Sequence, residues 1–219
     1  MEEFILKPKK TDKTLKILNL FCGIGGNRLK WTNCEVTAID LDSEICDLYQ
    51  KRFINDKVIC GDAFQFFEDH WEEYDVIWAS PPCQTHSRQQ YRQKEKVLPD
   101  FRLYSLIKFC QLWVKGKIWV IENVEVIDEV IPHTFKVNRH LFWSNLVIPS
   151  KTFEKLYNPP NYVGKDGKTH NGGLSDLSIA ELLELHQMED FNHKEKRSIL
   201  RNCVDYRIGE YILNYIQSK

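Results

Sequence analysis

The chain has 219 residues, of which 42% are hydrophobic, so it is large enough to fold as one compact domain with its own core. Its 30 basic and 31 acidic side chains give a formal net charge of −1, which excludes the general basic excess of many nucleic-acid-binding proteins. No apolar run approaches the roughly 20 residues of a membrane helix, and the first residues lack a secretory signal, so we expect an intracellular protein without a membrane partner.

Short apolar segments alternate with longer segments of helical spacing in the first part of the chain. The expected strands are residues 16–21, 35–39, 57–60, 74–79 and 117–121. Residues 43–52 are expected to form a helix capped by Ser43, and the apolar residues between Leu103 and Val114 share one helical face. This order predicts an α/β fold with a doubly wound, mostly parallel sheet, in which ligands bind beyond the carboxyl ends of the strands.

The character of the sequence changes after Asn138. A strand pair is expected around residues 140–148, and the turn-forming residues at 149–173 predict an irregular insert. Regular structure is expected again at residues 176–188 and at 202–217, where apolar side chains share a helical face.

A glycine-rich loop and two acids follow the first three predicted strands. The loop is Phe21-Cys-Gly-Ile-Gly-Gly26, where missing side chains allow a ligand to approach the backbone, although a plain tight turn explains such a loop equally well. Asp40 ends the second strand and Asp62 follows the third. At this edge one acid can bind a ribose hydroxyl pair and the other an adenine amino group, while helix capping is the simpler alternative for each. Together the loop and the acids predict an adenosyl cofactor.

The seven cysteines show none of the short spacings typical of zinc sites or redox pairs, so we expect no metal and no disulfide framework. Most of them are expected to be ordinary buried thiols. Cys83 differs because it follows Pro81 and Pro82 on a loop that leaves the fourth strand at the ligand edge. A rigid mount at this edge suits a nucleophile, whose activation needs local dipoles, a cation or a proton acceptor on the substrate.

Glu122 stands near the end of the fifth predicted strand, in Ile121-Glu-Asn-Val124. This position places a carboxyl group beside the Cys83 loop. A carboxyl that stays protonated in a pocket of low dielectric can donate to a heterocycle nitrogen, whereas an ordinary edge salt bridge is the plain alternative.

These segments together resemble the cytosine-5 DNA methyltransferase family. The matching segments, in the family's order, are Phe21-Cys-Gly-Ile-Gly-Gly26, Asp40-Leu-Asp42, Gly61-Asp-Ala63, Pro81-Pro-Cys-Gln84, Arg102-Leu-Tyr104, Glu122-Asn-Val124, residues 138–145, residues 182–191 and Asn202-Cys-Val204. The Pro-Pro-Cys-Gln and Glu-Asn-Val segments in this order are highly specific. The resemblance implies a Rossmann-like methyltransferase fold and S-adenosylmethionine as the cofactor.

The resemblance also implies roles for individual residues. Cys83 would add to carbon 6 of cytosine, and Glu122 would hold the ring nitrogen, with Asn123 fixing the loop. The family usually has two arginines one residue apart before a strand; this chain reads Asn138-Arg-His-Leu, so either Arg139 or His140 would grasp the cytosine carbonyl. Asn202-Cys-Val204 would begin the last helix and close the cofactor site. The expected cofactor contacts are Phe21, Gly23, Ile24, Gly26, Asp40, Leu41, Asp62, Ala63, Pro82, Leu103, Asn202 and Val204.

The expected partner is double-stranded DNA, with the target cytosine turned out of the helix into the pocket. Residues 86–96 hold four basic side chains against one Glu, and in this family the segment closes over DNA. Expected DNA contacts are Gln84, Ser87, Arg88, Gln89, Gln90, Tyr91 and Arg92.

The resemblance divides the chain into a catalytic and cofactor-binding domain at residues 1–148, a short target-recognition insert at 149–175 and C-terminal helices at 176–219. So short an insert implies that recognition is short or degenerate, or is helped by an accessory protein or self-association. We expect a cytoplasmic location in a prokaryotic or viral setting and a nuclear one in a eukaryote.

Two other readings remain open. A transfer-RNA cytosine-5 methyltransferase would share this scaffold, but the Cys-Phe-Thr signature typical of that branch is missing from the later half of the sequence. A catalytically silent regulatory homologue would also share this scaffold. Such relatives lose the cysteine, the glutamate or the glycine loop, whereas this chain has all three as Cys83, Glu122 and residues 21–26.

Overall fold

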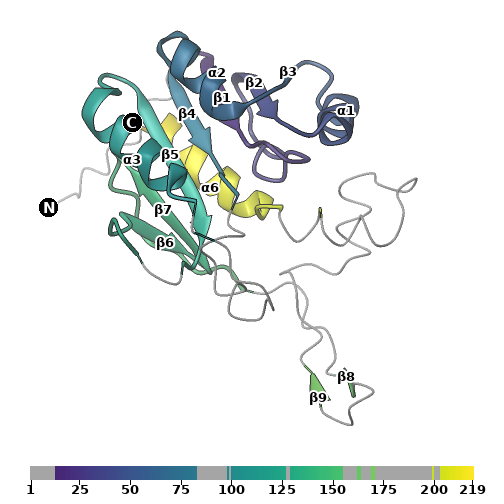
Figure 1. The fold of residues 1–219 in the computed structure, drawn as a ribbon, viewed down its shortest axis with the longest axis vertical. Helices are drawn as coiled ribbons and strands as arrows, with labels where there is room; N and C mark the ends of the chain where they lie inside the picture. Colours follow the sequence, from purple (N-terminus) through teal and green to yellow (C-terminus); the bar gives the residue numbers. More distant parts are fainter. Residues whose placement is uncertain are drawn as a thin grey trace, which may run out of the picture.

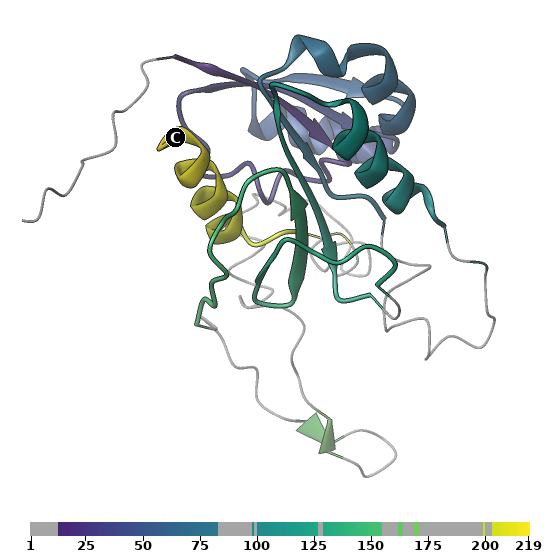
Figure 2. The same ribbon diagram turned by 90° about the vertical axis from the view of Figure 1, so that its left-hand side faces the viewer.

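The computed structural model describes residues 13–82, 98, 100–126, 129–154, 199 and 203–219, and the backbone of residues 162–163 and 169–170. Its main body is a seven-stranded sheet with helices on both faces (Figures 1 and 2). The strands of this sheet are β1 (Leu15–Leu20), β2 (Cys34–Asp40), β3 (Lys57–Cys60), β4 (Val76–Ala79), β5 (Ile118–Val124), β6 (Phe135–Val137) and β7 (His140–Ser144). The helices are α1 (Ser43–Arg52), α2 (Ala63–His70), the 3-10 turn η1 (Trp71–Glu73), α3 (Arg102–Trp113) and α6 (Tyr206–Gln217).

The strands lie in the order β3-β2-β1-β4-β5-β7-β6. Strands β1 to β5 pair in parallel, and β7 pairs antiparallel with both β5 and β6. This arrangement confirms the predicted doubly wound, mostly parallel sheet. The expected strand pair at 140–148 was displaced: the pair is β6 and β7, because Asn138, with φ 52°, makes the turn between them.

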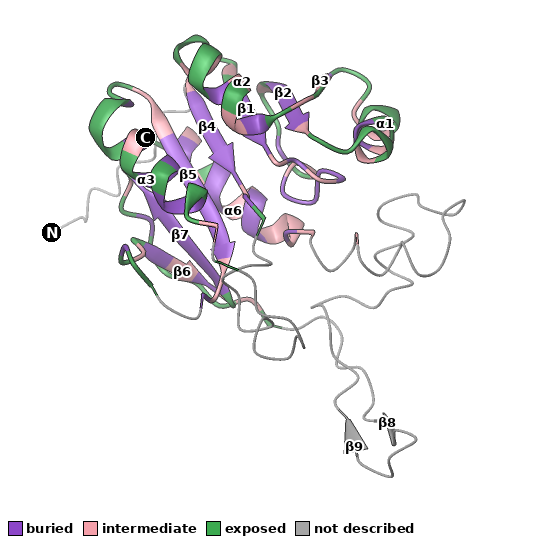
Figure 3. Ribbon diagram, in the orientation of Figure 1, coloured by how far each residue is buried: buried purple, intermediate pink, exposed green. Residues whose placement is uncertain are grey.

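Each face of the sheet has its own apolar layer, because side chains alternate along each strand. Helices α2 and α3 cover one face, where Phe67 and Ile107 pack against Leu18, Ile77 and Ile121. Helix α6 covers the other face and packs on Ile17, Val36, Val76, Trp78 and Val120 through Ile208, Ile212, Leu213 and Ile216. Figure 3 shows the buried strands between helices whose outer surfaces are exposed.

The N-terminal caps of α1 and α6 are aspartates that the sequence analysis did not select as caps. Helix α1 starts at Ser43 as expected, but its cap is Asp42, whose carboxylate accepts the backbone N–H groups of Glu44 and Ile45. The last helix was expected to begin at Asn202. Residues 203–205 are not helical, however, and α6 begins at Tyr206 with Asp205 as its cap. In both cases a carboxylate one residue before the helix satisfies the free N–H groups of its first turn.

The structure describes only residues 149–154 and the backbone of residues 162–163 and 169–170 of the predicted insert. Strands β8 (Tyr162–Val163) and β9 (Thr169–His170) form a separate antiparallel pair, and the expected structure at residues 176–188 lies outside the described residues. Within the described ranges, no helix combines the length and the apolar character needed to cross a membrane. The same ranges contain no group of three His, Cys, Asp or Glu side chains placed to hold a metal ion.

Candidate active site

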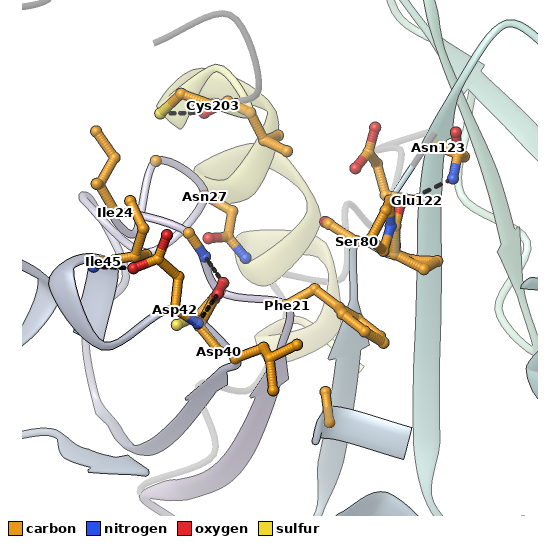
Figure 4. Close-up of a pocket in the computed structure, with 18 of the residues that line it drawn as sticks. Phe21, Ile24, Asn27, Asp40, Asp42, Ile45, Ser80, Glu122, Asn123 and Cys203 are labelled. Atoms are coloured by element: carbon orange, nitrogen blue, oxygen red, sulfur yellow. Dashed lines mark hydrogen bonds between the residues drawn. The ribbon is translucent and has the colours of Figure 1, made fainter. Parts of the chain in front are cut away.

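A cavity of about 490 Å³ opens at the carboxyl ends of β1, β2, β4 and β5. It lies within the range of roughly 300–1,000 Å³ typical of small-molecule sites. Figure 4 shows Asp40 and Asp42 on one side of it and Ser80 and Glu122 on the other. The position matches the rule that ligands bind beyond the carboxyl ends of parallel strands.

The glycine loop forms one wall of the cavity. Gly23 and Gly25 have φ of 50° and 76°, a region that favours glycine. A Cβ added at Gly23 would meet nothing within 4 Å, so the backbone there faces open space. A Cβ at Gly26 would lie 2.1 Å from Cys203 Sγ and 2.4 Å from the Val204 carbonyl oxygen. The loop therefore presents bare backbone to the cavity at Gly23 and packs tightly against the segment before α6 at Gly26.

Asp40 and Asp62 each do structural work while lining the cavity. The Asp40 carboxylate accepts the Gly23 N–H at 2.9 Å and the Asp42 N–H at 3.2 Å, so it joins the end of β2 to the glycine loop. Asp62 caps α2 by accepting the N–H groups of Phe64 and Gln65. Capping and ligand binding, which the sequence presented as alternatives, are compatible at Asp62 because it also lines the cavity.

An ion pair between the half-buried Arg28 and the buried Asp56 holds the chain that follows the glycine loop. Arg28 donates to Asp56 through Nε at 2.8 Å and Nη2 at 3.0 Å, and the Tyr49 hydroxyl donates to the same carboxylate at 2.9 Å. Burial alone would lower the pKa of Arg28, but the hydrogen bonds and charge of Asp56 outweigh it and raise this pKa. These hydrogen bonds join Arg28, which follows the glycine loop, to Tyr49 of α1 and to Asp56 in the turn before β3.

Glu122 and His140 meet on the side opposite the acids. The distance between Glu122 Oε1 and His140 Nδ1 is 2.6 Å, and the two residues are only 4% and 6% exposed. In the antiparallel register of β5 and β7, Glu122 faces Phe142 and His140 faces Val124, so Glu122 and His140 are diagonal neighbours on one face.

The two residues of the Arg-His pair lie in different environments. His140 lines the cavity, whereas Arg139 is exposed beside the turn.

The chain that leads to Cys83 runs along the same wall. Ser80, Pro81 and Pro82 line the cavity, and the Asn123 side-chain amide donates to the Pro81 carbonyl at 3.0 Å. Asn123 therefore fixes the start of the loop to β5, directly beside Glu122. Cys83 itself lies outside the described residues.

Burial makes most of the described thiols poor nucleophiles. It is the main cause that raises the pKa of Cys22 and Cys34, and it raises those of Cys46, Cys110 and Cys203 to about 12. A thiol must ionise to attack, so these five side chains are unsuited to nucleophilic catalysis near neutral pH.

The cavity collects most of the described residues predicted for the site. Those that line it are Phe21, Gly23, Ile24, Gly26, Asp40, Leu41, Asp62, Ala63, Pro82, Glu122, His140 and Val204. Leu103 does not line it: the side chain is 2% exposed in the core under α3, while its neighbour Arg102 lines the cavity. The predicted residues outside the described chain are Cys83, Gln84, Ser87, Arg88, Gln89, Gln90, Tyr91, Arg92 and Asn202.

Further lining residues were not among the predicted contacts, although Asn123 was expected to fix the Cys83 loop. They are Cys22, Asn27, Asp42, Ile45, Phe64, Ser80, Pro81, Arg102, Asn123, Val124, Ile199 and Cys203. Several adjoin predicted positions, which was an available signal. Arg102 directly precedes the predicted contact Leu103, and its guanidinium lies 4.8 Å from the centroid of the Phe64 ring.

Comparisons with known proteins agree with this geometry. The family model of the C-5 cytosine-specific DNA methylases matches residues 15–136, more than half of the chain. A triple-substitution variant of DNMT2 from Spodoptera frugiperda is similar in structure, with a TM-score of 0.61 and 14% identity over 94% of this chain and 100% of that chain. The methyltransferase EhMeth of Entamoeba histolytica has a TM-score of 0.54 and 13% identity over 93% of this chain and 98% of that chain.

At these identities the two structures show the fold alone. A search of the curated proteins found no match. The family assignment therefore rests on the matched family model, and the matched segment contains the glycine loop, both acids and Glu122. The chain belongs to the C-5 cytosine-specific DNA methylase family and is an S-adenosylmethionine-dependent methyltransferase.

Proposed function

We propose that the chain methylates carbon 5 of cytosine in double-stranded DNA, through a covalent adduct of Cys83 with a base turned out of the helix. The observation that carries the proposal is the buried Glu122–His140 pair, which shares one cavity with the glycine loop and the Pro81–Pro82 approach to Cys83. A carboxyl group, a glycine loop and the backbone that leads to the proposed nucleophile therefore border one cavity, which supports the proposal.

The cavity fits the cofactor of this family. Bare backbone at Gly23 leaves room where a Cβ would intrude, and three carboxylates, those of Asp40, Asp42 and Asp62, line the same end. Carboxylates suit the ribose hydroxyls, the amino groups and the positive sulfonium of S-adenosylmethionine. When bound, this cofactor supplies an electrophilic methyl group. Phe21, Gly23, Asp40 and Asp62 are the residues we assign to holding it.

Cys83 is the proposed nucleophile because carbon 5 of cytosine reacts poorly by itself. Addition of its thiolate to carbon 6 makes carbon 5 nucleophilic, and the adduct breaks down after the carbon-5 proton leaves. The hydrogen bond from Asn123 anchors the backbone at Pro81, two residues before Cys83, and such anchoring suits a nucleophile that must be held in place.

Glu122 is the proposed partner of the cytosine ring nitrogen. Negative charge develops on the ring as the thiolate adds, and a proton held by the carboxyl disperses it. If His140 donates its Nδ1–H to Oε1, the second carboxyl oxygen remains available to the base. His140 thus orients Glu122, in the position where the family usually has an arginine.

DNA is the favoured substrate because the matched family model is that of the DNA methylases. The basic segment at residues 86–96 supplies the local positive charge that phosphate contact requires in a chain of net charge −1. We assign Gln84, Ser87, Arg88, Gln89, Gln90, Tyr91 and Arg92 to that contact. The short insert leaves room for an accessory protein or a second copy in sequence recognition.

The test is transfer of radiolabelled methyl groups from S-adenosylmethionine to duplex DNA, transfer RNA and other RNA. Label is expected in DNA only. It should disappear in Cys83→Ser and persist in Cys34→Ser, a control at the start of β2, outside the cavity lining. Labelled transfer RNA with unlabelled DNA would show that the substrate is wrong. Tight DNA binding without any label would identify a silent homologue, and bisulfite sequencing of host DNA would give the target sequence.

A further inference from the structure

Two thiols flank the backbone that frames the cofactor end of the cavity. Cys46 lies on α1, and its S–H donates to the Asp40 carbonyl at 3.4 Å. Cys60 ends β3, and its S–H donates to the Leu41 carbonyl at 3.5 Å. Asp40 and Leu41 both line the cavity, so consecutive carbonyls of this wall are held by two different cysteines.

The two thiols are direct neighbours. Cys60 stands opposite Asp40 in the parallel register of β2 and β3, and Cys46 Sγ is 3.9 Å from the carbonyl oxygen of Ile59, the residue before Cys60. Burial first, and then the charge and hydrogen bond of Cys60, raise the pKa of Cys46 to about 12. Cys46 Sγ also lies 3.4 Å from the carbonyl oxygen of Asp40, the residue opposite Cys60 in the register, so both thiols lie at the ends of β2 and β3.

The two thiols differ in their exposure to solvent, and this difference suits oxidation of one thiol before the other. Cys60 is exposed, and Cys46 is buried behind it. A reagent in solution therefore reaches Cys60 first and finds a second thiol beside it. This is the arrangement of an oxidisable cysteine with its resolving partner.

We propose that Cys46 and Cys60 are an oxidation site, and that a peroxide closes them into a disulfide that weakens cofactor binding. In the first step the Cys60 thiol is oxidised to a sulfenic acid, and the peroxide is reduced to water. In the second step the Cys46 sulfur attacks this sulfenic acid, its proton leaves with the hydroxyl group as water, and the S–S bond forms. This step is slow because the buried Cys46 thiol is seldom ionised. The net reaction converts two thiols and one hydrogen peroxide into one disulfide and two waters.

The bond acts on the cavity through Asp40. Oxidation removes both S–H donors, so the carbonyls of Asp40 and Leu41 lose these hydrogen bonds while the sulfurs are drawn together. The Asp40 carboxylate holds the Gly23 N–H at 2.9 Å, so a shift of the Asp40 backbone also disturbs the glycine loop. The proposal rests on the assignment of this end of the cavity to the cofactor, and not on the choice of nucleic acid.

The experiment measures S-adenosylhomocysteine binding by calorimetry in the full chain carrying Cys83→Ser, which removes the proposed catalytic thiol. Treatment with hydrogen peroxide should link the Cys46 and Cys60 peptides in mass spectra and weaken binding about fivefold or more, within the usual range of coupling between sites. Dithiothreitol should restore both. Adding Cys60→Ser, which keeps a hydroxyl donor near Leu41, should abolish the response to peroxide. Adding Cys34→Ser should leave the response intact.

Three outcomes would overturn the proposal. The first is the absence of the linked peptide, and the second is a complete link with unchanged affinity. The third is an equal loss of affinity in Cys60→Ser, which would place the oxidation at Cys22 or Cys203, the two described thiols that line the cavity. Because binding is measured without nucleic acid, failure of the proposed DNA methylation would leave this test unaffected.

Discussion

Gly209→Ala is expected to destabilise the protein although the position is helical. Gly209 lies in the first half of α6, where alanine by itself would favour the helix by about 1 kcal/mol. A Cβ there, however, would lie 2.0 Å from the Asn27 carbonyl oxygen and 2.7 Å from the Asn27 carbonyl carbon. Both atoms belong to the backbone just after the glycine loop, so no side-chain rotation relieves the contact.

The magnitude follows from the two opposed effects. Added volume in a packed contact costs about 1–3 kcal/mol, and the upper end applies here because backbone faces backbone. After subtraction of the helix gain, we expect a net loss of about 2 kcal/mol in the free energy of unfolding. For a chain of this size that loss lowers Tm by about 4–8 °C. Asn27 lines the cavity, so S-adenosylhomocysteine affinity should fall as well.

Thermal unfolding followed by circular dichroism measures the change. The matched control is Asn214→Ala, an exposed position of the same helix, which should raise Tm slightly through helix propensity alone. An unchanged or higher Tm in Gly209→Ala would refute the reasoning, because it would mean that the contact between α6 and the glycine loop segment yields easily.

Three further predictions follow from the site. His140→Gln should lower methyl-transfer turnover about 100-fold by releasing Glu122, whereas Arg139→Gln should stay close to wild type; equal losses would contradict the assignment. Arg28→Met should lower the free energy of unfolding in urea by about 3–5 kcal/mol, because it leaves the buried Asp56 carboxylate without its cation. The control Arg102→Met should lower it by less than about 1 kcal/mol, because its partner Asp100 is part-exposed. Burial raises the pKa of Cys110 from 9.0 to about 12, so the stability that the protonated thiol contributes is complete below pH 9 and is lost as the pH rises to 12. Between these pH values the urea midpoint of Cys110→Ala should fall less steeply than that of the wild type. Parallel slopes would contradict this prediction.

The sheet could be predicted because its signal is local. The apolar runs gave β3 with its observed bounds and the other four parallel strands within a few residues. The largest difference concerns β5, which extends to Val124, so Glu122 lies inside the strand and its direction follows from strand alternation. The cap of α1 was placed one residue late because Asp42 and Ser43 are both good capping residues, and only the backbone conformation chooses between them.

Contacts across strands could not be predicted in the same way. The sequence could not say whether Arg139 or His140 faces the cavity, because this depends on the register of β7, which the left-handed turn at Asn138 sets. The neighbouring positions of Cys46 and Cys60 depend on the pairing of β2 with β3 and on the packing of α1. Leu103 was misplaced for a related reason, since one step along α3 separates a core position from a cavity position.

The position of α6 has a consequence for synthesis of the chain. The strands that it covers are made early, whereas α6 leaves the ribosome only after the long segment that follows β7. During that interval the apolar face formed by Ile17, Val76, Trp78 and Val120 has no covering helix, and such a surface promotes aggregation. The same helix completes the wall at Gly26 through the residues before it, so a nascent chain acquires a stable core and a closed cofactor cavity in one late step.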